Sequence, residues 1–401
     1  MRGSFGVLLM RISQTALVFV LSVALARTLG VEKFGIYALC ISIVQLLTIP
    51  AMAGGQQMLI RETAAYKAKQ LLPFLRGVTR RVLQISTFLS IILTFSAAGV
   101  GYFTIDDRQT LIPYLVSLTL IPLLACLRLQ VARLIGLRHV LSGQAIESFQ
   151  PILLLLLIWP MYALLHQGLA PELVILARIF VAAFLLVAAF SILRKVELGQ
   201  TRQVHPKYET KKWLASMIPF AFAGSMQVLN REISVVGLGL LQDAESVGLF
   251  RVAQRGAELV SFGLIAVNMA IAPIISELFT KGELQRLQRL IHRSALAVLT
   301  FAVIVTIGLV WKGSMLISAV FGQEFAPAYV PLIILCLGHL INAGMGSVGL
   351  ILNMTGLERY NAQGVAISAF LSIILNMTLI PIWGFFGAAI ALVFLVPLLP
   401  V

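Results

Sequence analysis

Five charged residues lie inside two apolar segments in the second half of the chain. Arg231 and Glu232 fall in the first segment, and Arg251, Arg255 and Glu258 fall in the second. At about 100° per residue, the last three share one face of a helix, spread over about 60°. Two arginines against one glutamate leave an excess positive charge, while Arg231 offsets Glu232, so the pattern favours an anionic ligand. The alternative is a structural role, in which Glu258 and one of its neighbouring arginines satisfy each other.

The composition indicates where such a face must lie. Hydrophobic residues make up 59% of the 401 residues and charged residues only 11%, which excludes a soluble fold and predicts an all-α polytopic membrane protein. Charges inside membrane spans cost about 2.5 to 3.5 kcal/mol each on insertion scales and usually face a bundle interior or a water-filled cavity. The five charged residues are therefore expected to line a transport path. About twelve apolar runs are long enough to cross a bilayer, at residues 5–27, 36–56, 82–104, 111–132, 149–166, 173–193, 214–239, 247–272, 294–311, 328–352, 361–380 and 383–400.

The lysines and arginines are distributed unevenly between the two sides of these spans. With the N-terminus in the cytoplasm, most of the 30 lysines and arginines fall in cytoplasmic loops, and those left outside are Arg27, Lys33, Arg108 and Lys312. This asymmetry is the positive-inside rule, so the expected topology is N-in and C-in. The net charge of +14 is thus assigned to topology and to anionic membrane lipids, and nucleic acid is not an expected partner.

A polar, basic stretch at residues 194–213 separates six spans from six spans. It predicts a cytoplasmic linker between an N-terminal six-helix bundle, residues 1–193, and a C-terminal one, residues 214–401. The halves look related, because the pattern E-x-x-G-[IL]-[YF]-x-[LV] begins at Glu32 and, at a constant offset that other positions share, again at Glu245. An even number of spans in each half gives both repeats the same orientation, and the two bundles are expected to flank a central cavity.

The repeats differ at the charged face. Ala38, Ser42 and Gln45 of the first copy stand where the second copy has Arg251, Arg255 and Glu258. Outside that face, Arg11 and Arg128 can either snorkel toward the head groups or point into a bundle. His339 is interpreted as a hydrogen-bonded interior residue in preference to a proton carrier.

The sequence offers no enzyme site. The outer loops are short, and no constellation of Ser, Cys and His or Asp-rich sugar-nucleotide motif stands out. Cys40, Cys126 and Cys336 lie within predicted spans with neither a C-x-x-C motif nor a histidine cluster. The G-M-G-S-V-G run at residues 344–349 matches a dinucleotide fingerprint, but no strand precedes it, and it is interpreted as close helix packing. No catalytic residue, cofactor or metal is therefore expected.

Three stretches of the chain resemble motifs of one protein family. ALARTLGVEKFGIYALCISIVQLL resembles the signature of polysaccharide transporters, the O-antigen and teichoic-acid flippase branch of the multidrug/oligosaccharidyl-lipid/polysaccharide exporter superfamily. LNREISVVGLGLLQDAESVGLFRVAQRGAELVSF resembles the second-half counterpart, and LNMTGLERYNAQG resembles a later inter-helix motif. The acidic position of the family's seventh helix is Glu232 here, and the preceding Arg231 departs from the family pattern. The resemblance implies a multi-pass flippase of the bacterial or archaeal inner membrane, which moves undecaprenyl-pyrophosphate-linked oligosaccharide repeat units outward for O-antigen, capsule or exopolysaccharide assembly.

The resemblance also gives the charged residues roles. The expected contacts to the pyrophosphate or to acidic sugars are, in order of weight, Arg251, Arg255, Arg231 and Arg11. Glu258 and Glu232 would tune or release these arginines, and either would carry the charge change if a proton or sodium ion is coupled. The implied partners are the lipid-linked oligosaccharide, membrane lipids, and the polymerase and glycosyltransferases of the same assembly. The alternatives are a cation-coupled multidrug exporter or a lipid II flippase of the same superfamily, and, from another class, a membrane glycosyltransferase or polymerase.

Overall fold

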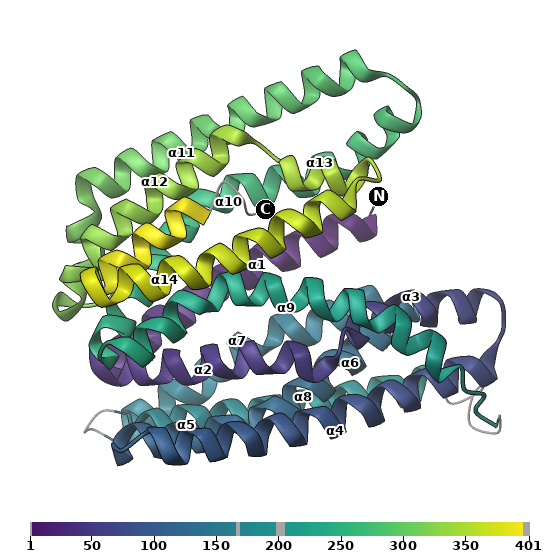
Figure 1. Cartoon of the computed structure of the whole chain (residues 1–401), viewed down its shortest axis with the longest axis horizontal. Helices are drawn as coiled ribbons and strands as arrows, with labels where there is room; N and C mark the ends of the chain where they lie inside the picture. The colour runs from purple at the N-terminus through teal and green to yellow at the C-terminus, as the bar shows by residue number, and fades with distance from the viewer. Residues whose placement is uncertain (1, 166–168, 198–204, 396–401) are drawn as a thin grey trace. The chain divides into compact units, whose positions relative to one another are not determined.

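A computed structural model describes residues 2–165, 169–197 and 205–395, with the backbone alone for residues 2–9, 11, 12, 165 and 197. Every regular element in these ranges is a helix (Figure 1), which confirms the predicted all-α class. Among the described residues, nine helices are long and apolar enough to cross a membrane. Most residues of the predicted apolar runs lie in helices where they are described, although the runs 36–56, 111–132 and 328–352 each cross from one helix into the next. The last two runs share one helix that is broken at Gly384 (φ 56°, ψ −134°).

Two compact units divide the chain, and the first comprises Met1–Leu21 and Cys40–Val228. Helix α6 is its core, with residues such as Leu120, Ile121 and Leu134 fully buried against α3, α4, α7 and α8. The helices that begin in this unit are α1 (Arg2–Leu29), α3 (Gly55–Ala68), α4 (Leu72–Thr104), α5 (Arg108–Leu118), α6 (Leu120–Gly136), α7 (Val140–Leu165), α8 (Pro171–Glu197) and α9 (Thr210–Leu241).

The second unit comprises Ser22–Leu39 and Leu229–Val401, so it includes the end of α1 and the start of α2. Helices α10, α11 and α12 lie side by side and pack closely (Figure 1). The predicted tenth span is not continuous, because Gly346 (φ 74°) ends α12 and a short helix follows. The helices that begin in this unit are α2 (Val31–Met52), α10 (Ala244–Thr280), α11 (Leu284–Val320), the 3-10 helix η1 (Gln323–Ala328), α12 (Tyr329–Met345), α13 (Val348–Met354) and α14 (Glu358–Leu395).

A tyrosine contact that occurs once in each unit supports the internal repeat. In the first unit the Tyr114 hydroxyl donates to the Ala97 carbonyl at 2.8 Å, and its ring lies against Gly101. In the second unit the Tyr329 hydroxyl donates to the Val310 carbonyl at 2.7 Å, and its ring lies against Gly313. In both copies the hydroxyl satisfies a helix carbonyl while the missing Cβ lets the ring approach the backbone.

The repeated E-x-x-G motif packs against its own second copy. A Cβ on Gly35 of α2 would overlap the carbonyl oxygen of Ala244, and a Cβ on Gly248 of α10 would overlap that of Val31. At the constant offset of the repeat, Val31 corresponds to Ala244 and Gly35 to Gly248. The contact is therefore reciprocal, which is how equivalent surfaces meet across a two-fold axis.

The end of α1 is fixed to the second unit by Arg27. Its Nε donates to the Val320 carbonyl at 2.7 Å, and its Nη2 donates to the Ala319 carbonyl. These are among the last carbonyl groups of α11, which have no partner within their own helix, and a cation is favoured at this negative end of the helix dipole. Arg27 thus acts as a C-terminal cap for α11.

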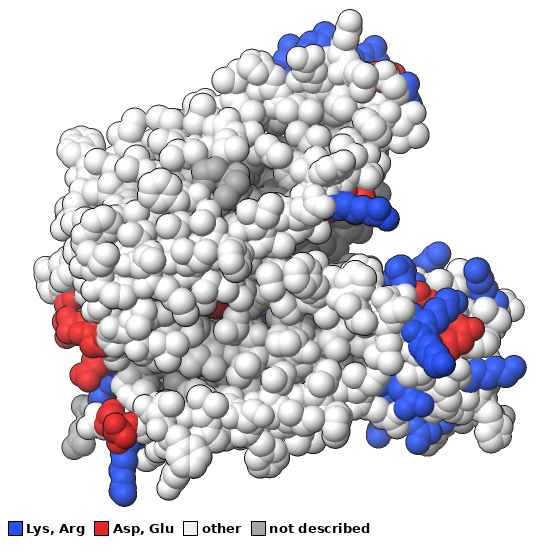
Figure 2. Space-filling view, viewed as in Figure 1, with Lys and Arg blue, Asp and Glu red and all other residues white. Residues whose placement is uncertain are grey.

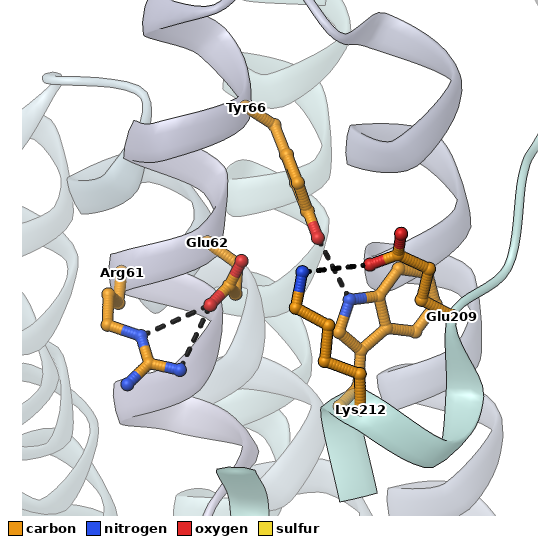
Figure 3. A network of polar contacts seen from close by, with 6 residues as sticks. Arg61, Glu62, Tyr66, Glu209 and Lys212 are labelled. Carbon is orange, nitrogen blue, oxygen red and sulfur yellow. Dashed lines mark hydrogen bonds and ion pairs between the residues drawn. The ribbon is translucent and has the colours of Figure 1, made fainter.

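The start of α9 is anchored to the first unit by an aromatic and ionic network (Figure 3). The Trp213 indole donates to the Tyr66 hydroxyl at 3.1 Å, and Lys212 pairs with Glu209 at 3.1 Å beside it. Trp213 is fully buried. The chain before α9 is tied down as well, because the Lys207 amide donates to the Pro73 carbonyl at 3.0 Å. This network fixes the part of the linker that precedes α9, while residues 198–204 lie outside the described ranges.

Charged side chains gather at the ends of the helices (Figure 2). In the first unit, lysines and arginines concentrate where α3, α4 and the start of α9 meet, and acidic side chains appear at the opposite end. In the second unit, lysines and arginines concentrate at the α10–α11 turn. Each basic end carries loops that the sequence assigns to the cytoplasm, as the positive-inside rule requires.

Asp243 caps the N-terminus of α10, the helix that carries the charged face. Its carboxylate accepts from the Ser246 amide at 2.8 Å, and the hydrogen bonds from the Ser246 side chain and amide hold the pKa of Asp243 below its ordinary value. Asp243→Ala is expected to cost about 1 kcal/mol at neutral pH. The depressed pKa makes this contribution complete above the unfolded-state value of about 3.9 and lost as the pH falls through the lower folded-state value.

Thermal melts in detergent from pH 7 to pH 3 test this cap. The gap between wild type and Asp243→Ala should narrow at the acid end, whereas Asp243→Asn, whose amide oxygen accepts at any pH, should differ from Asp243→Ala by a constant amount. A wild-type gap that does not change with pH would contradict the assignment.

Candidate functional site

Helix α10 places the predicted charged residues two to four turns after its capped start. Arg251 is almost completely buried, with 8% of its surface exposed. Arg255 and Glu258 are more open, with 27% and 39% of their side chains exposed. The charged face of α10 is therefore buried at Arg251 and more exposed at Arg255 and Glu258.

Arg251 forms a buried ion pair with Glu232 of α9. The guanidinium donates to the Glu232 carboxylate at 2.7 Å and to the Gln254 side chain at 2.9 Å. Only 10% and 15% of the two charged side chains are exposed. Sequence spacing did not suggest this pair, because it set Glu232 against Arg231 and considered Glu258 as the partner for both arginines of α10. Since a buried charge needs a partner, the Glu232 carboxylate offsets the cost of burying the Arg251 guanidinium inside the bundle.

Arg255 and Glu258 form the second ion pair of the site. Arg255 Nη1 lies 2.8 Å from Glu258 Oε2, and the two residues have the i, i+3 spacing that allows a pair within one helix. The Nε atom of Arg255 is buried and has no hydrogen-bond acceptor among the described residues. A guanidinium has five donors in a planar fork, so Arg255 has capacity for an oxygen ligand besides Glu258.

The remaining predicted contacts are less well placed. Arg231 is exposed at its position in α9, and no ion pair involving it occurs in the described ranges. The side chain of Arg11 lies outside the described part of the chain. The structure therefore brings together two arginines and two glutamates, and within this group the charges balance.

The first unit holds a related pair that the motif search did not single out. Arg128 of α6 donates to the Gln45 side chain at 2.6 Å. Gln45 is the first-repeat counterpart of Glu258, so both copies hold an arginine with this position of the second helix or its equivalent. Gln45 binds its arginine through a neutral amide. The signal for this contact in the sequence is the presence of Arg128 inside another apolar run.

The His, Cys, Asp and Glu side chains of the described residues are dispersed. No three His, Cys, Asp or Glu side chains of the described residues gather as metal ligands would. Cys40, Cys126 and Cys336 are all free thiols. The site is thus built from ion pairs within apolar helices.

A family model described as "Polysaccharide biosynthesis protein" matches residues 1–279, which include the whole charged face of α10. The chain belongs to this family. As a member of the polysaccharide biosynthesis family, it is 28% identical over 160 residues to the "Probable low-salt glycan biosynthesis flippase Agl15" of Haloferax volcanii. That match covers 40% of this chain and 34% of the relative, so the chain spans about a third of that relative's length.

Solved structures share the fold of this polysaccharide biosynthesis family member. One, described as an inward-facing multidrug resistance MATE family transporter of the MOP superfamily, has a TM-score of 0.75 at 11% identity and covers 96% of this chain and 91% of its own. The lipid II flippase MurJ, in an inward closed conformation, has a TM-score of 0.69 at 14% identity, with coverages of 97% and 85%. At these identities the likeness concerns the fold alone, and it confirms the predicted transporter architecture of a multi-pass membrane protein.

Proposed function

We propose that the chain is a flippase that moves undecaprenyl-pyrophosphate-linked oligosaccharide repeat units across the plasma membrane by alternating access. Membership of the polysaccharide biosynthesis family and the likeness to a glycan biosynthesis flippase support a lipid-linked glycan as the substrate class. O-antigen, capsule and exopolysaccharide are the polymers that such units build, and the polymerase and glycosyltransferases of that assembly are the proposed functional neighbours.

The observation that carries the proposal is the uneven pairing of the two arginines of α10. Arg251 is closed off by Glu232 and Gln254, whereas Arg255 keeps an unpartnered donor and lies in the more exposed pair. Pyrophosphate offers several anionic oxygens and suits the planar fork of a guanidinium. Arg255 is therefore the proposed primary contact, and Arg251 and Arg231 support it.

Binding would proceed by exchange of one anion for another. Glu258 occupies Arg255 in the present structure, and the pyrophosphate would take over part of that interaction while the lipid tail stays in the bilayer. Because the exchange replaces one charge-assisted contact with another, the arginine is not left unpaired in an apolar setting. A bound substrate can thus leave again, as transport requires.

Arg255→Ala is expected to reduce flipping by about tenfold or more, since a hydrogen bond to a charged group is worth about 1.5 to 3 kcal/mol. Arg255→Lys should recover only part of the rate, because an ammonium lacks the bidentate geometry. The measurement is the outward movement of a labelled undecaprenyl-pyrophosphate glycan in proteoliposomes, with Arg251→Ala and Glu258→Gln assayed beside it.

Arg289→Ala is the matched control, because Arg289 is an exposed arginine of α11 that touches none of these residues. Wild-type rates in Arg255→Ala, Arg251→Ala and Glu258→Gln at equal membrane abundance would refute the site. Lipid II and a cationic drug should be offered to the same liposomes, since a preference for either would replace the proposal with one of the two alternative transport functions.

A further inference from the structure

The segment that precedes α9 lies against the start of α4 in the first unit, at the end of the helices that the sequence assigns to the cytoplasm. The Lys207 amide donates to the Pro73 carbonyl at 3.0 Å. The Lys207 carbonyl lies so close to Gly77 that a Cβ on this glycine would overlap its oxygen. Because glycine permits this close approach of two backbones, the chain at Lys207 is held against α4.

This contact places the ring of Tyr208 beside Arg81 of α4. The guanidinium carbon of Arg81 lies over the ring, 4.9 Å from its centroid. The Nε atom of Arg81 is buried and has no hydrogen-bond partner among the described residues. A cation–π contact uses none of the five N–H donors of a guanidinium. Arg81 is therefore positioned by an aromatic ring while its charge is left for an anion.

Positive charge exceeds negative charge around Arg81. The two carboxylates of the network in Figure 3 each pair with a cation, at 3.0 and 3.1 Å, so their charge is already balanced. Beside Tyr208, the exposed side chains of Lys207 and Lys211 add two positive charges. Figure 2 shows lysines and arginines gathered at this end of the first unit. The surface formed by Arg81, Lys207 and Lys211 therefore fits an anionic group.

An apolar surface continues from these cations along α9. Leu214, Ile218 and Phe222 follow Lys211 by three, seven and eleven residues, so the four positions share one face of the helix. The three apolar side chains are exposed. A phospholipid presents a phosphate and acyl chains in the same order, whereas a free phosphate would gain nothing from the apolar surface. The arrangement favours a lipid as the anion.

We propose that Arg81, Lys207 and Lys211 bind the phosphate of an anionic phospholipid from the cytoplasmic leaflet. Arg81 donates to the phosphate oxygens, whose geometry suits its planar fork, and the two lysines add electrostatic attraction. One acyl chain lies along the exposed face of α9. Because Arg81 belongs to α4 and the lysines to the segment that enters α9, the lipid joins the two and holds the end of the linker against the first unit. The inference does not depend on which substrate the protein carries.

The test titrates phosphatidylglycerol into the full chain in neutral detergent and measures bound lipid by native mass spectrometry, with phosphatidylcholine as the lipid without net charge. Wild type should bind phosphatidylglycerol more tightly than phosphatidylcholine. Arg81→Ala should lower the affinity for phosphatidylglycerol by about tenfold or more, because a hydrogen bond to a charged group is lost. Lys207→Gln and Lys211→Gln should each lower it by about fivefold. These two exposed positions serve if Arg81→Ala does not fold.

Two substitutions at Tyr208 test the positioning of Arg81 without changing the charge of the surface. Tyr208→Phe keeps the ring and should bind phosphatidylglycerol as wild type does. Tyr208→Leu removes the ring and should weaken binding by about two- to fivefold, because an exposed cation–π contact is lost. Arg289→Ala is the control for charge, since Arg289 is an exposed arginine of α11 in the second unit, and it should keep the wild-type affinity.

Three results would overturn the lipid site. Equal losses of affinity in Arg81→Ala and Arg289→Ala would indicate general attraction to a basic surface. Displacement of the lipid by an equal concentration of inorganic phosphate would make the ligand a free anion. Displacement by a lower concentration of undecaprenyl pyrophosphate would assign the site to the transported substrate, and the phospholipid would then be the wrong ligand.

Discussion

Glu232→Gln is expected to destabilise the protein by about 3 to 5 kcal/mol, which is the usual cost of breaking a buried ion pair from one side. The substitution keeps the shape of the side chain but removes the charge of the carboxylate that lies 2.7 Å from the Arg251 guanidinium, where only 10% of the arginine side chain is exposed. The cost cannot be avoided by neutralisation, because a guanidinium is not deprotonated in proteins. The expected result is a large fall in melting temperature in detergent and in the amount of folded protein in the membrane.

The double variant Arg251→Met, Glu232→Leu shows whether the loss of stability comes from losing the ion pair itself or from leaving one buried charge behind. Replacing both partners with apolar residues of similar volume is often neutral, so this variant should be much more stable than Glu232→Gln, although its flipping rate should stay low. Glu277→Gln is the control, because Lys281 and Glu277 form a pair with 57% and 61% of their side chains exposed, and ion pairs that water screens contribute little to stability. Equal losses in Glu232→Gln and Glu277→Gln would rule out a dominant buried pair.

Gly35→Ala is expected to be nearly as damaging, although it adds only one methyl group. The new Cβ would overlap the carbonyl oxygen of Ala244, and a backbone oxygen cannot rotate away as a side chain can. Overpacking usually costs about 1 to 3 kcal/mol, and here the two helices must separate to relieve it. The melting temperature should fall, and Gly248→Ala should behave in the same way because its Cβ would meet Val31 in the reciprocal contact.

Gly99→Ala and Gly308→Ala provide matched controls within helices α4 and α11. A Cβ at either position meets nothing within 4 Å, and alanine is a better helix former than glycine by about 1 kcal/mol. Both variants should therefore be as stable as wild type or slightly more so. If Gly35→Ala melts at the temperature of these controls, the close crossing of α2 and α10 is not a constraint on folding.

Much of the fold could be predicted from the sequence. Membrane-spanning helices need long apolar runs, and the positive-inside rule places basic residues in the cytoplasmic loops. The duplicated motif at Glu32 and Glu245 also predicts two related halves, and the similar contacts of Tyr114 and Tyr329 are consistent with that prediction. The break at Gly346 could not be placed, since a glycine inside an apolar run is compatible with a continuous helix. The inclusion of Ser22–Leu39 in the second unit was also beyond reach, because hydropathy marks a span without saying what packs against it.

The candidate site was predictable in its residues but not in its pairings. A helical period puts Arg251, Arg255 and Glu258 on one face, because that depends on one helix alone. The pairing of Arg251 with Glu232 depends on which face α9 turns toward α10, and no periodicity within either segment specifies it. The lack of a hydrogen-bond partner for Nδ1 of His339 among the described residues could not be predicted for the same reason, because it is a property of the packed helices.

The network at the start of α9 also contains a tryptophan that can serve as an intrinsic fluorescence probe. Of its four tryptophans, Trp159, Trp311 and Trp383 are 79%, 81% and 52% exposed, whereas Trp213 is 1% exposed and bonded to Tyr66. Brominated lipid should quench the fluorescence of those three and spare Trp213. The residual emission would then come from the junction of the linker and α9 alone, so that movements of this joint during substrate binding could be followed without attaching a dye.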